Sequence, residues 1–141
     1  MSSIPITMSG KSGAVPTFVS RPATDRICSS VNVFDTARHE VITRIKAGAR
    51  SNGIIAHPDG HRIFVTSGGK GTVQVIDTAT NTIVKEIPVG RRPWNMALTP
   101  DGKKLYVAAG RSNAVAVIDT VTYAKVAEIP VGELPWGVAI R

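Results

Sequence analysis

Three hexapeptides decide the fold of this chain: VNVFDT (31–36), VQVIDT (73–78) and VAVIDT (115–120). They begin 42 residues apart, and other positions keep the same spacing: Ile45, Ile87 and Ile129, and Gly48, Gly90 and Gly132. The turn sequence Pro-Asp-Gly at 58–60 also recurs at 100–102. A fixed period of this length is typical of repeat architectures, in which each repeat packs against its neighbours.

Each repeat is predicted to form four short strands. The V-x-V-x-D pattern alternates with period two and the apolar runs are about five residues long, which favours strands over helices. In the second repeat the predicted strands are 52–56, 62–66, 72–76 and 82–89. Four antiparallel strands in a repeat of this length match the size of a β-propeller blade. The sequence therefore predicts an all-β fold of three four-stranded antiparallel blades, with twelve strands.

One aspartate follows the third strand of each repeat: Asp35, Asp77 and Asp119. A short carboxylate at the start of a turn accepts hydrogen bonds from backbone N–H groups about two residues further on. We therefore interpret these aspartates as turn residues rather than catalytic acids.

The second repeat carries a family resemblance. The stretch TVQVIDTATNTIVKEIPVGRRPWNMALTPDGKKLYVAA (72–109) resembles the YVTN-type β-propeller repeat of bacteria and archaea. The resemblance extends from about Ala14 to Arg141, with the tetrad itself degenerate, as in Tyr106-Val107-Ala108-Ala109. It implies a propeller of the kind found in exported, surface-layer-like or quinoprotein-like bacterial proteins. It implies no catalytic residues that can be transferred to this chain.

The repeat count predicts an assembly. We expect residues 1–13 to form an N-terminal arm and residues 14–141 a three-blade domain. Three blades cannot close a ring, since propellers have roughly four to eight. We therefore expect either a homodimer that forms a six-bladed ring, which we favour, or an open sector of a larger propeller. The strand at 136–140 is expected to complete the first blade; the alternative is that residues 5–8 supply that strand.

Composition limits the classes of function. The chain has 141 residues, a formal net charge of +7 and one cysteine, Cys28, which excludes an internal disulfide and cysteine-rich metal sites. No apolar stretch is long enough to span a membrane, and the N-terminal residues lack the pattern of a signal peptide. The family resemblance nevertheless suggests an exported protein, so the compartment stays open.

The positive charge is concentrated in one set of predicted loops. In a four-stranded meander, the loop into the first strand and the loop between the second and third strands lie at the same end of the blade. Basic residues occupy these loops, and we expect five of them to form a binding face: Arg50, Lys70, Arg91, Arg92 and Arg111. The opposite end carries the repeated aspartates. A basic field of this kind attracts anionic partners.

The histidines and tryptophans are interpreted as structural residues and not as parts of a site. His39, His57 and His61 are expected to be solvated turn residues rather than metal ligands, because the equivalents of the last two are Thr99 and Lys103. Trp94 and Trp136 share a repeat position and are expected to pack between blades. We predict no catalytic residues, no metal site and no cofactor.

The sequence therefore favours a non-enzymatic binding or scaffold module. Its basic loop face would bind a protein or another polyanionic surface, with non-specific nucleic-acid binding as a weaker option. The alternative is a quinoprotein-like or lactonase-like propeller enzyme, or a redox accessory subunit.

Overall fold

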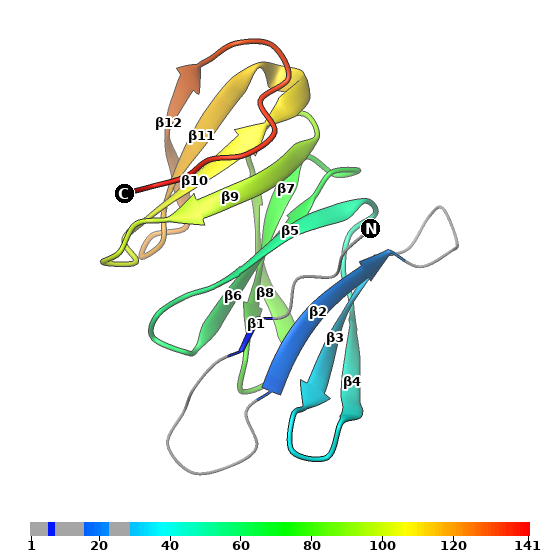
Figure 1. Cartoon of the computed structure of the whole chain (residues 1–141). Coiled ribbons are helices and arrows are strands. Elements are labelled where there is room, and N and C mark those ends of the chain that lie inside the picture. The colour runs from blue at the N-terminus through cyan, green and yellow to red at the C-terminus, as the bar shows by residue number, and fades with distance from the viewer. Residues whose placement is uncertain (1–5, 8–15, 23–28) are drawn as a thin grey trace.

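The chain forms three antiparallel sheets of four strands each in the computed structural model, which describes residues 6–7, 16–22 and 29–141 (Figure 1). Sheet 1 contains β1 (Ile6–Thr7), β2 (Pro16–Pro22), β3 (Ser29–Asp35) and β4 (Glu40–Lys46). Sheet 2 contains β5 (Ser51–Ala56), β6 (Arg62–Ser67), β7 (Thr72–Asp77) and β8 (Thr82–Pro88). Sheet 3 contains β9 (Pro93–Leu98), β10 (Lys104–Ala109), β11 (Ala114–Asp119) and β12 (Ala124–Pro130), with the 3-10 turn η1 (Gly110–Ser112) between β10 and β11. In each sheet the strands follow one another in chain order.

The predicted all-β fold and the four-stranded antiparallel repeat are confirmed. The four strands expected in the second repeat coincide with β5 to β8 to within a residue or two. Backbone conformation also repeats every 42 residues: His39, Asn81 and Tyr123 have φ of 58°, 55° and 58° in the turns before β4, β8 and β12. The local turn chemistry therefore follows the sequence repeat.

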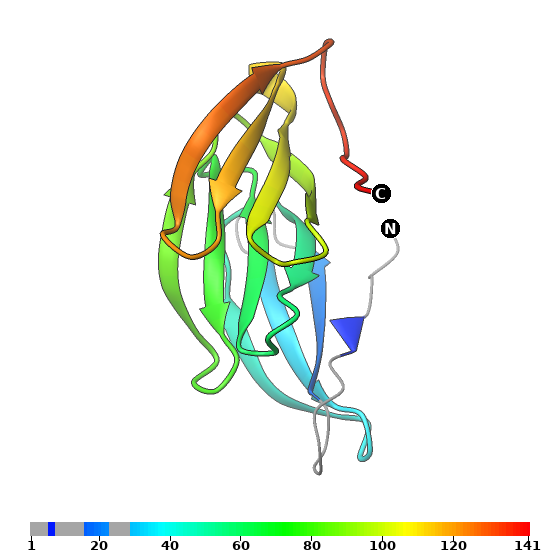
Figure 2. The same ribbon diagram turned by 90° about the vertical axis from the view of Figure 1, so that its left-hand side faces the viewer.

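The sheets fan out from their first strands (Figures 1 and 2). Strands β5 and β9 contact each other closely, whereas the outer strands β8 and β12 make few contacts with each other. Such a fan, with close inner strands and separated outer strands, is propeller-like.

Two apolar cores hold the sheets together, and each is formed by facing sheet surfaces. We call the surface of a sheet that faces the preceding sheet its leading face, and the surface that faces the following sheet its trailing face. Between sheets 1 and 2 the core consists of Val31, Val33, Ile45, Ala47, Ile63, Val65 and Ile76. Between sheets 2 and 3 it consists of Phe64, Val73, Val75, Ile87, Val89, Met96, Leu105, Val107, Ala116 and Ile118. Successive side chains of a strand point to opposite faces of its sheet, so sheet 2 contributes one group of apolar side chains to each core.

The turn aspartates have the structural role that the sequence predicts. Asp77 Oδ1 accepts hydrogen bonds from the backbone N–H groups of Ala79 and Thr80 at 2.8 and 3.0 Å. Asp35 and Asp119 accept the equivalent bonds in the other two repeats.

The expected position of the C-terminal strand is wrong. Residues 136–140 form no strand; the Trp136 carbonyl instead accepts a hydrogen bond from Asn95 N at 3.3 Å, and in Figure 2 this segment runs outside the sheets. In sheet 1 the place beside β2 is taken by β1, where Ile6 pairs with Phe18 and Thr7 with Thr17. The alternative register, in which the N-terminal residues supply this strand, therefore agrees with the structure.

Candidate functional site

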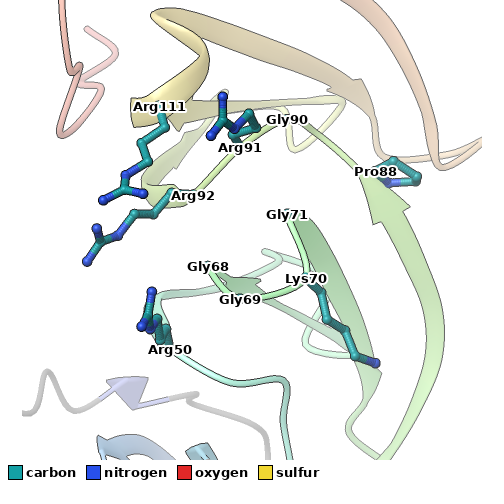
Figure 3. A pocket seen from close by; sticks show the side chains of 10 residues that line it. All are labelled: Arg50, Gly68, Gly69, Lys70, Gly71, Pro88, Gly90, Arg91, Arg92 and Arg111. Carbon is teal, nitrogen blue, oxygen red and sulfur yellow. The ribbon is translucent and has the colours of Figure 1, made fainter. Parts of the chain in front are cut away.

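The five basic residues singled out in the sequence line a single pocket. The pocket has a volume of about 490 Å³ and lies between sheets 2 and 3 (Figure 3). Its lining consists of Arg50, Gly68, Gly69, Lys70, Gly71, Pro88, Gly90, Arg91, Arg92 and Arg111. We call it the arginine pocket. It contains five basic side chains and no carboxylate among its lining residues.

In sheets 2 and 3, backbone hydrogen bonds join the loop that leads into the first strand to the loop between the second and third strands. In sheet 2, Gly68 N donates to the Arg50 carbonyl at 3.0 Å. In sheet 3 the repeat-equivalent bond runs from Gly110 N to the Arg92 carbonyl at 3.2 Å. Because the same loop pairing recurs, the arginines of successive sheets are brought to the same end of the molecule.

Glycines allow the loops of sheets 2 and 3 to approach closely. Gly71 has φ of 71°, and a Cβ there would lie 2.6 Å from the Gly90 carbonyl oxygen. Gly90 has φ of 122°, and its Cβ would lie 2.8 Å from Ser112 Oγ. Side chains at either position would push the pocket walls apart.

Arg92 is held by an aromatic ring. Its guanidinium carbon lies 4.9 Å from the centroid of the Trp94 ring, within the range of a cation–π interaction. Its Nε atom is buried and has no hydrogen-bond partner in the described part of the chain. A buried donor without a partner lowers the stability of the folded protein.

Lys70 differs from the four arginines. Its Nζ atom lies 2.9 Å from Glu86 Oε1, and Figure 3 shows its side chain pointing away from the arginines. Hydrogen bonds from Lys70 and Gln74 lower the pKa of Glu86. Among the described residues, no carboxylate lies within ion-pair distance of Arg50, Arg91, Arg92 or Arg111. These four guanidinium groups are therefore the part of the pocket that can bind an anion.

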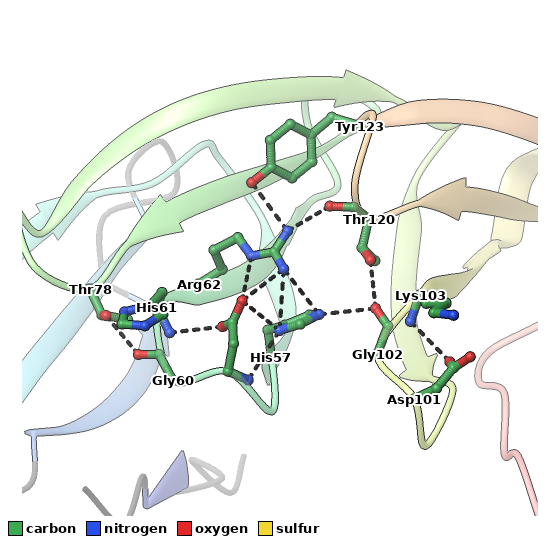
Figure 4. A network of polar contacts seen from close by, with 11 residues as sticks. His57, Gly60, His61, Arg62, Thr78, Asp101, Gly102, Lys103, Thr120 and Tyr123 are labelled. Atoms are coloured by element: carbon green, nitrogen blue, oxygen red, sulfur yellow. Dashed lines mark hydrogen bonds and ion pairs between the residues drawn. The ribbon is translucent and has the colours of Figure 1, made fainter.

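The expectation of solvated turn histidines is wrong for His57. Its side chain is only 11% exposed, with Nδ1 2.9 Å from Asp59 Oδ2 and Nε2 3.0 Å from the Gly102 carbonyl (Figure 4). Arg62 completes this network by binding Asp59 at 2.8 Å and the Thr120 carbonyl at 2.6 Å. The network links sheet 2 to sheet 3 at the end opposite the arginine pocket. In the ranges that the structure describes, no cluster of three or more metal-ligating side chains occurs.

The tryptophans agree only in part with the expected packing between blades, because their rings contact each other across successive repeats while Trp136 stays largely exposed. The rings of Trp94 and Trp136 lie 6.5 Å apart and are tilted by 37°, and Trp136 is 66% exposed. Trp94 also contacts the guanidinium group of Arg92. No pattern in the sequence indicates the contact between Arg92 and Trp94, although a single proline separates the two residues.

In the part of the chain that the structure describes, no helix is long and apolar enough to cross a bilayer.

The chain is similar to known proteins in structure, whereas no protein-family model matches it and no curated protein sequence matches it significantly. Among solved structures, hydrazine synthase of Kuenenia stuttgartiensis matches with a TM-score of 0.78 and 28% identity, covering 86% of this chain and 34% of that one. Dihydro-heme d1 dehydrogenase NirN matches with a TM-score of 0.78 and 18% identity (97% and 31% covered), and AztD from Citrobacter koseri with 0.70 and 17% (89% and 34%). The chain thus spans about a third of the length of these proteins.

These similarities correct the expected function. A non-enzymatic scaffold is contradicted, because the structural neighbours include enzymes, among them hydrazine synthase at 28% identity. The alternative interpretation, an enzyme or a redox accessory subunit, agrees better with these neighbours. The described residues therefore form propeller-like sheets similar to those of hydrazine synthase, with a pocket between sheets 2 and 3 whose four arginines form no ion pair with another described residue.

Proposed function

We propose that this chain is the propeller part of a redox enzyme, or of an accessory subunit of one, and that the arginine pocket holds the anionic group of a cofactor or substrate. One observation carries the proposal: four arginines that have no carboxylate partner among the described residues surround one pocket, in a propeller-like fold similar to that of hydrazine synthase. Arginine suits this task because its planar guanidinium binds carboxylate in a bidentate manner and keeps its charge at any physiological pH.

A tetrapyrrole carboxylate is the ligand chemistry we favour. One structural neighbour is named as a dehydrogenase of dihydro-heme d1, which is a tetrapyrrole. The ten residues that line the pocket include no histidine, cysteine or methionine. The pocket therefore fits the acidic edge of such a molecule rather than its metal centre. When bound, the tetrapyrrole would supply the electron-transfer chemistry, and the arginines of this chain would bind and orient it.

Hemin is a suitable probe, and tryptophan fluorescence is a suitable signal. Because Arg92 lies against Trp94, a ligand that binds Arg92 should quench the fluorescence of that ring. We expect saturable quenching by hemin. Replacing Arg92 and Arg111 with alanine should weaken binding about tenfold or more, since a hydrogen bond to a charged group contributes roughly 1.5–3 kcal/mol.

The matched control removes two cations from the opposite end. Arg38 and Lys103 are both exposed and lie in turns away from the pocket, so Arg38→Ala with Lys103→Ala should leave hemin affinity unchanged. Hemin dimethyl ester, which lacks free carboxylates, should bind the unaltered protein as weakly as hemin binds the pocket variant. Equal binding of the acid and the ester, or equal losses in the two double variants, would refute the proposal.

A further inference from the structure

Lys70 lines the arginine pocket, but an ion pair holds its charge away from the arginines. Its Nζ atom lies 2.9 Å from Glu86 Oε1, and the two side chains are 55% and 37% exposed. An ion pair this exposed contributes little to stability, because water screens the two charges and two long side chains must be ordered to form it. The pair between Lys70 and Glu86 can therefore open at small cost.

Glu86 has a second hydrogen-bond donor and does not depend on Lys70. Gln74 Nε2 donates to the same Oε1 atom of Glu86 at 2.6 Å. Gln74 is 1% exposed and lies on the leading face of sheet 2, where its Oε1 accepts a hydrogen bond from Gly48 N at 3.0 Å. Because the amide of Gln74 is fixed at both ends, it keeps its hydrogen bond to Glu86 when Lys70 leaves.

The loop that carries Lys70 leaves its side chain free to turn. Lys70 stands between Gly69 and Gly71, and all three residues line the pocket. A lysine has a flexible four-carbon stem, so rotation about its bonds redirects the ammonium without moving the backbone. Figure 3 shows the stem pointing away from the arginines. The same stem turned towards them would place a fifth cation in the pocket.

The sequence repeat shows that the outer strand does not itself require this lysine. Glu128 is the equivalent of Glu86 in sheet 3, and it pairs with Lys125 of its own strand at 2.6 Å. The position equivalent to Lys70 is Ser112 there. A glutamate at this position is thus paired without a cation from the loop, so the strand does not explain why sheet 2 has a lysine at the pocket.

The pocket has more cations and more room than a single carboxylate needs. A carboxylate can accept about four hydrogen bonds, whereas one guanidinium already has about five donors. Four arginines with no ion-pair partner among the described residues line this pocket. Its volume of about 490 Å³ lies within the range of roughly 300–1,000 Å³ that is typical of small-molecule sites. The pocket therefore fits a ligand with more than one acidic group.

We propose that the arginine pocket binds a ligand with two acidic groups, and that the second of these groups competes with Glu86 for Lys70. The arginines bind the first group. The second group draws the ammonium of Lys70 into the pocket, while Gln74 continues to bind Glu86. Lys70 is thus a specificity-determining residue that favours diacids over monoacids. This inference rests on the proposed function, because it names the class of ligand that the same pocket binds.

Quenching of tryptophan fluorescence by hemin and by hemin monomethyl ester tests the proposal, since hemin has two carboxylates and the monoester has one. Lys70→Met removes the charge and keeps the length of the side chain. It should weaken hemin binding about fivefold or more and leave the affinity for the monoester unchanged. Glu86→Gln removes the competing charge and should strengthen hemin binding about twofold to fivefold, again with no effect on the monoester.

A double variant separates competition for Lys70 from a general effect of charge. Glu86→Gln should have no effect on hemin affinity in the Lys70→Met background, because no ammonium is left to be released. The matched controls lie in the exposed ion pair of β12, which does not line the pocket. Glu128→Gln and Lys125→Met make the same changes of charge there and should leave hemin affinity unchanged.

The proposal is overturned if Lys70→Met weakens hemin and the monoester equally, or if it weakens neither. It is also overturned if Glu86→Gln strengthens hemin binding to the same extent with and without Lys70. Each of these results leaves the proposed function intact and removes only the role of Lys70. Equal binding of hemin and its dimethyl ester by the unaltered protein would overturn the proposed function as well.

Discussion

At the scale of single residues, glycine conformation sets the shape of the arginine pocket. Gly71 stands where the third repeat has Asn113, and both have a left-handed backbone, with φ of 71° and 52°. Asn113 shows that a side chain tolerates this conformation in the repeat. Only at Gly71 does the Gly90 carbonyl occupy the space that a Cβ would need. The demand for glycine thus comes from the neighbouring sheet as well as from the turn.

Gly71→Ala should therefore destabilise the protein. The left-handed conformation and the contact with the Gly90 carbonyl together should lower the free energy of unfolding by about 1–3 kcal/mol. Gly137→Ala is the control, since its Cβ would lie 3.7 Å from the nearest atom, an ordinary contact. Urea denaturation of both variants checks the expectation. Equal stabilities would show that the Gly90 loop moves aside without cost.

At the scale of elements, the turn between β5 and β6 ties sheet 2 to sheet 3. Arg62 at the start of β6 donates to the carbonyl of Thr120, which directly follows β11, and its guanidinium carbon lies 5.9 Å from the centroid of the Tyr123 ring. The repeat-equivalent residue, Lys104, instead binds Asp119 within its own sheet at 2.6 Å. Two cations at one repeat position therefore have different tasks, one between sheets and one within a sheet.

Comparison of Arg62→Ala with Lys104→Ala tests this difference. Loss of Arg62 removes charge-assisted hydrogen bonds between sheets and should lower the free energy of unfolding by about 1.5–3 kcal/mol. Loss of Lys104 breaks a partly exposed pair and should cost roughly 0–1 kcal/mol. Arg62→Lys should not restore stability, because an ammonium cannot bind Asp59 and Thr120 with the same planar fork. Equal effects of the two alanine variants, measured by urea unfolding, would contradict a special role for Arg62.

At the scale of the whole molecule, the end opposite the pocket is rich in carboxylates that are stabilised in their charged form. A hydrogen bond from Lys104, followed by those from the Thr122 and Val121 N–H groups, holds the pKa of Asp119 well below its usual range. Backbone N–H groups of Thr80 and Ala79 lower the pKa of Asp77. The two ends of the stack therefore differ in chemistry: one contains arginines with no ion-pair partner among the described residues, and the other contains aspartates that already accept hydrogen bonds.

Acid should consequently destabilise the protein. Each of these carboxylates has a lower pKa in the folded state than in the unfolded chain, so the unfolded state binds more protons as the pH falls. The stability they contribute is present near neutral pH and is lost as the pH falls from about 5 towards 3 and below. Urea unfolding across this range should show a decline that is smaller for Asp119→Asn than for the unaltered protein. A free energy of unfolding that is constant or rises on acidification would contradict this account.

The sequence by itself determined the repeat, the strands and the location of the pocket arginines. These features depend on local patterns: alternation with period two defines strands, and turn residues such as Asp77 and Gly60 act on their own backbone. Since the meander places equivalent loops at equivalent ends, the repeat alone indicated that Arg50, Arg92 and Arg111 lie together. Membership of the YVTN-type repeat family stays a prediction.

Only the tertiary structure decided which contacts form between residues far apart in sequence. It placed Ile6–Thr7 beside β2, paired Lys70 with Glu86, and joined His57 to Gly102 across 45 positions. It also distinguished Ile129 from Ile87, which the repeat treats as equivalent. Such differences depend on which sheet happens to cover a side chain, and a periodic sequence cannot state this because every repeat presents the same pattern to a different neighbour.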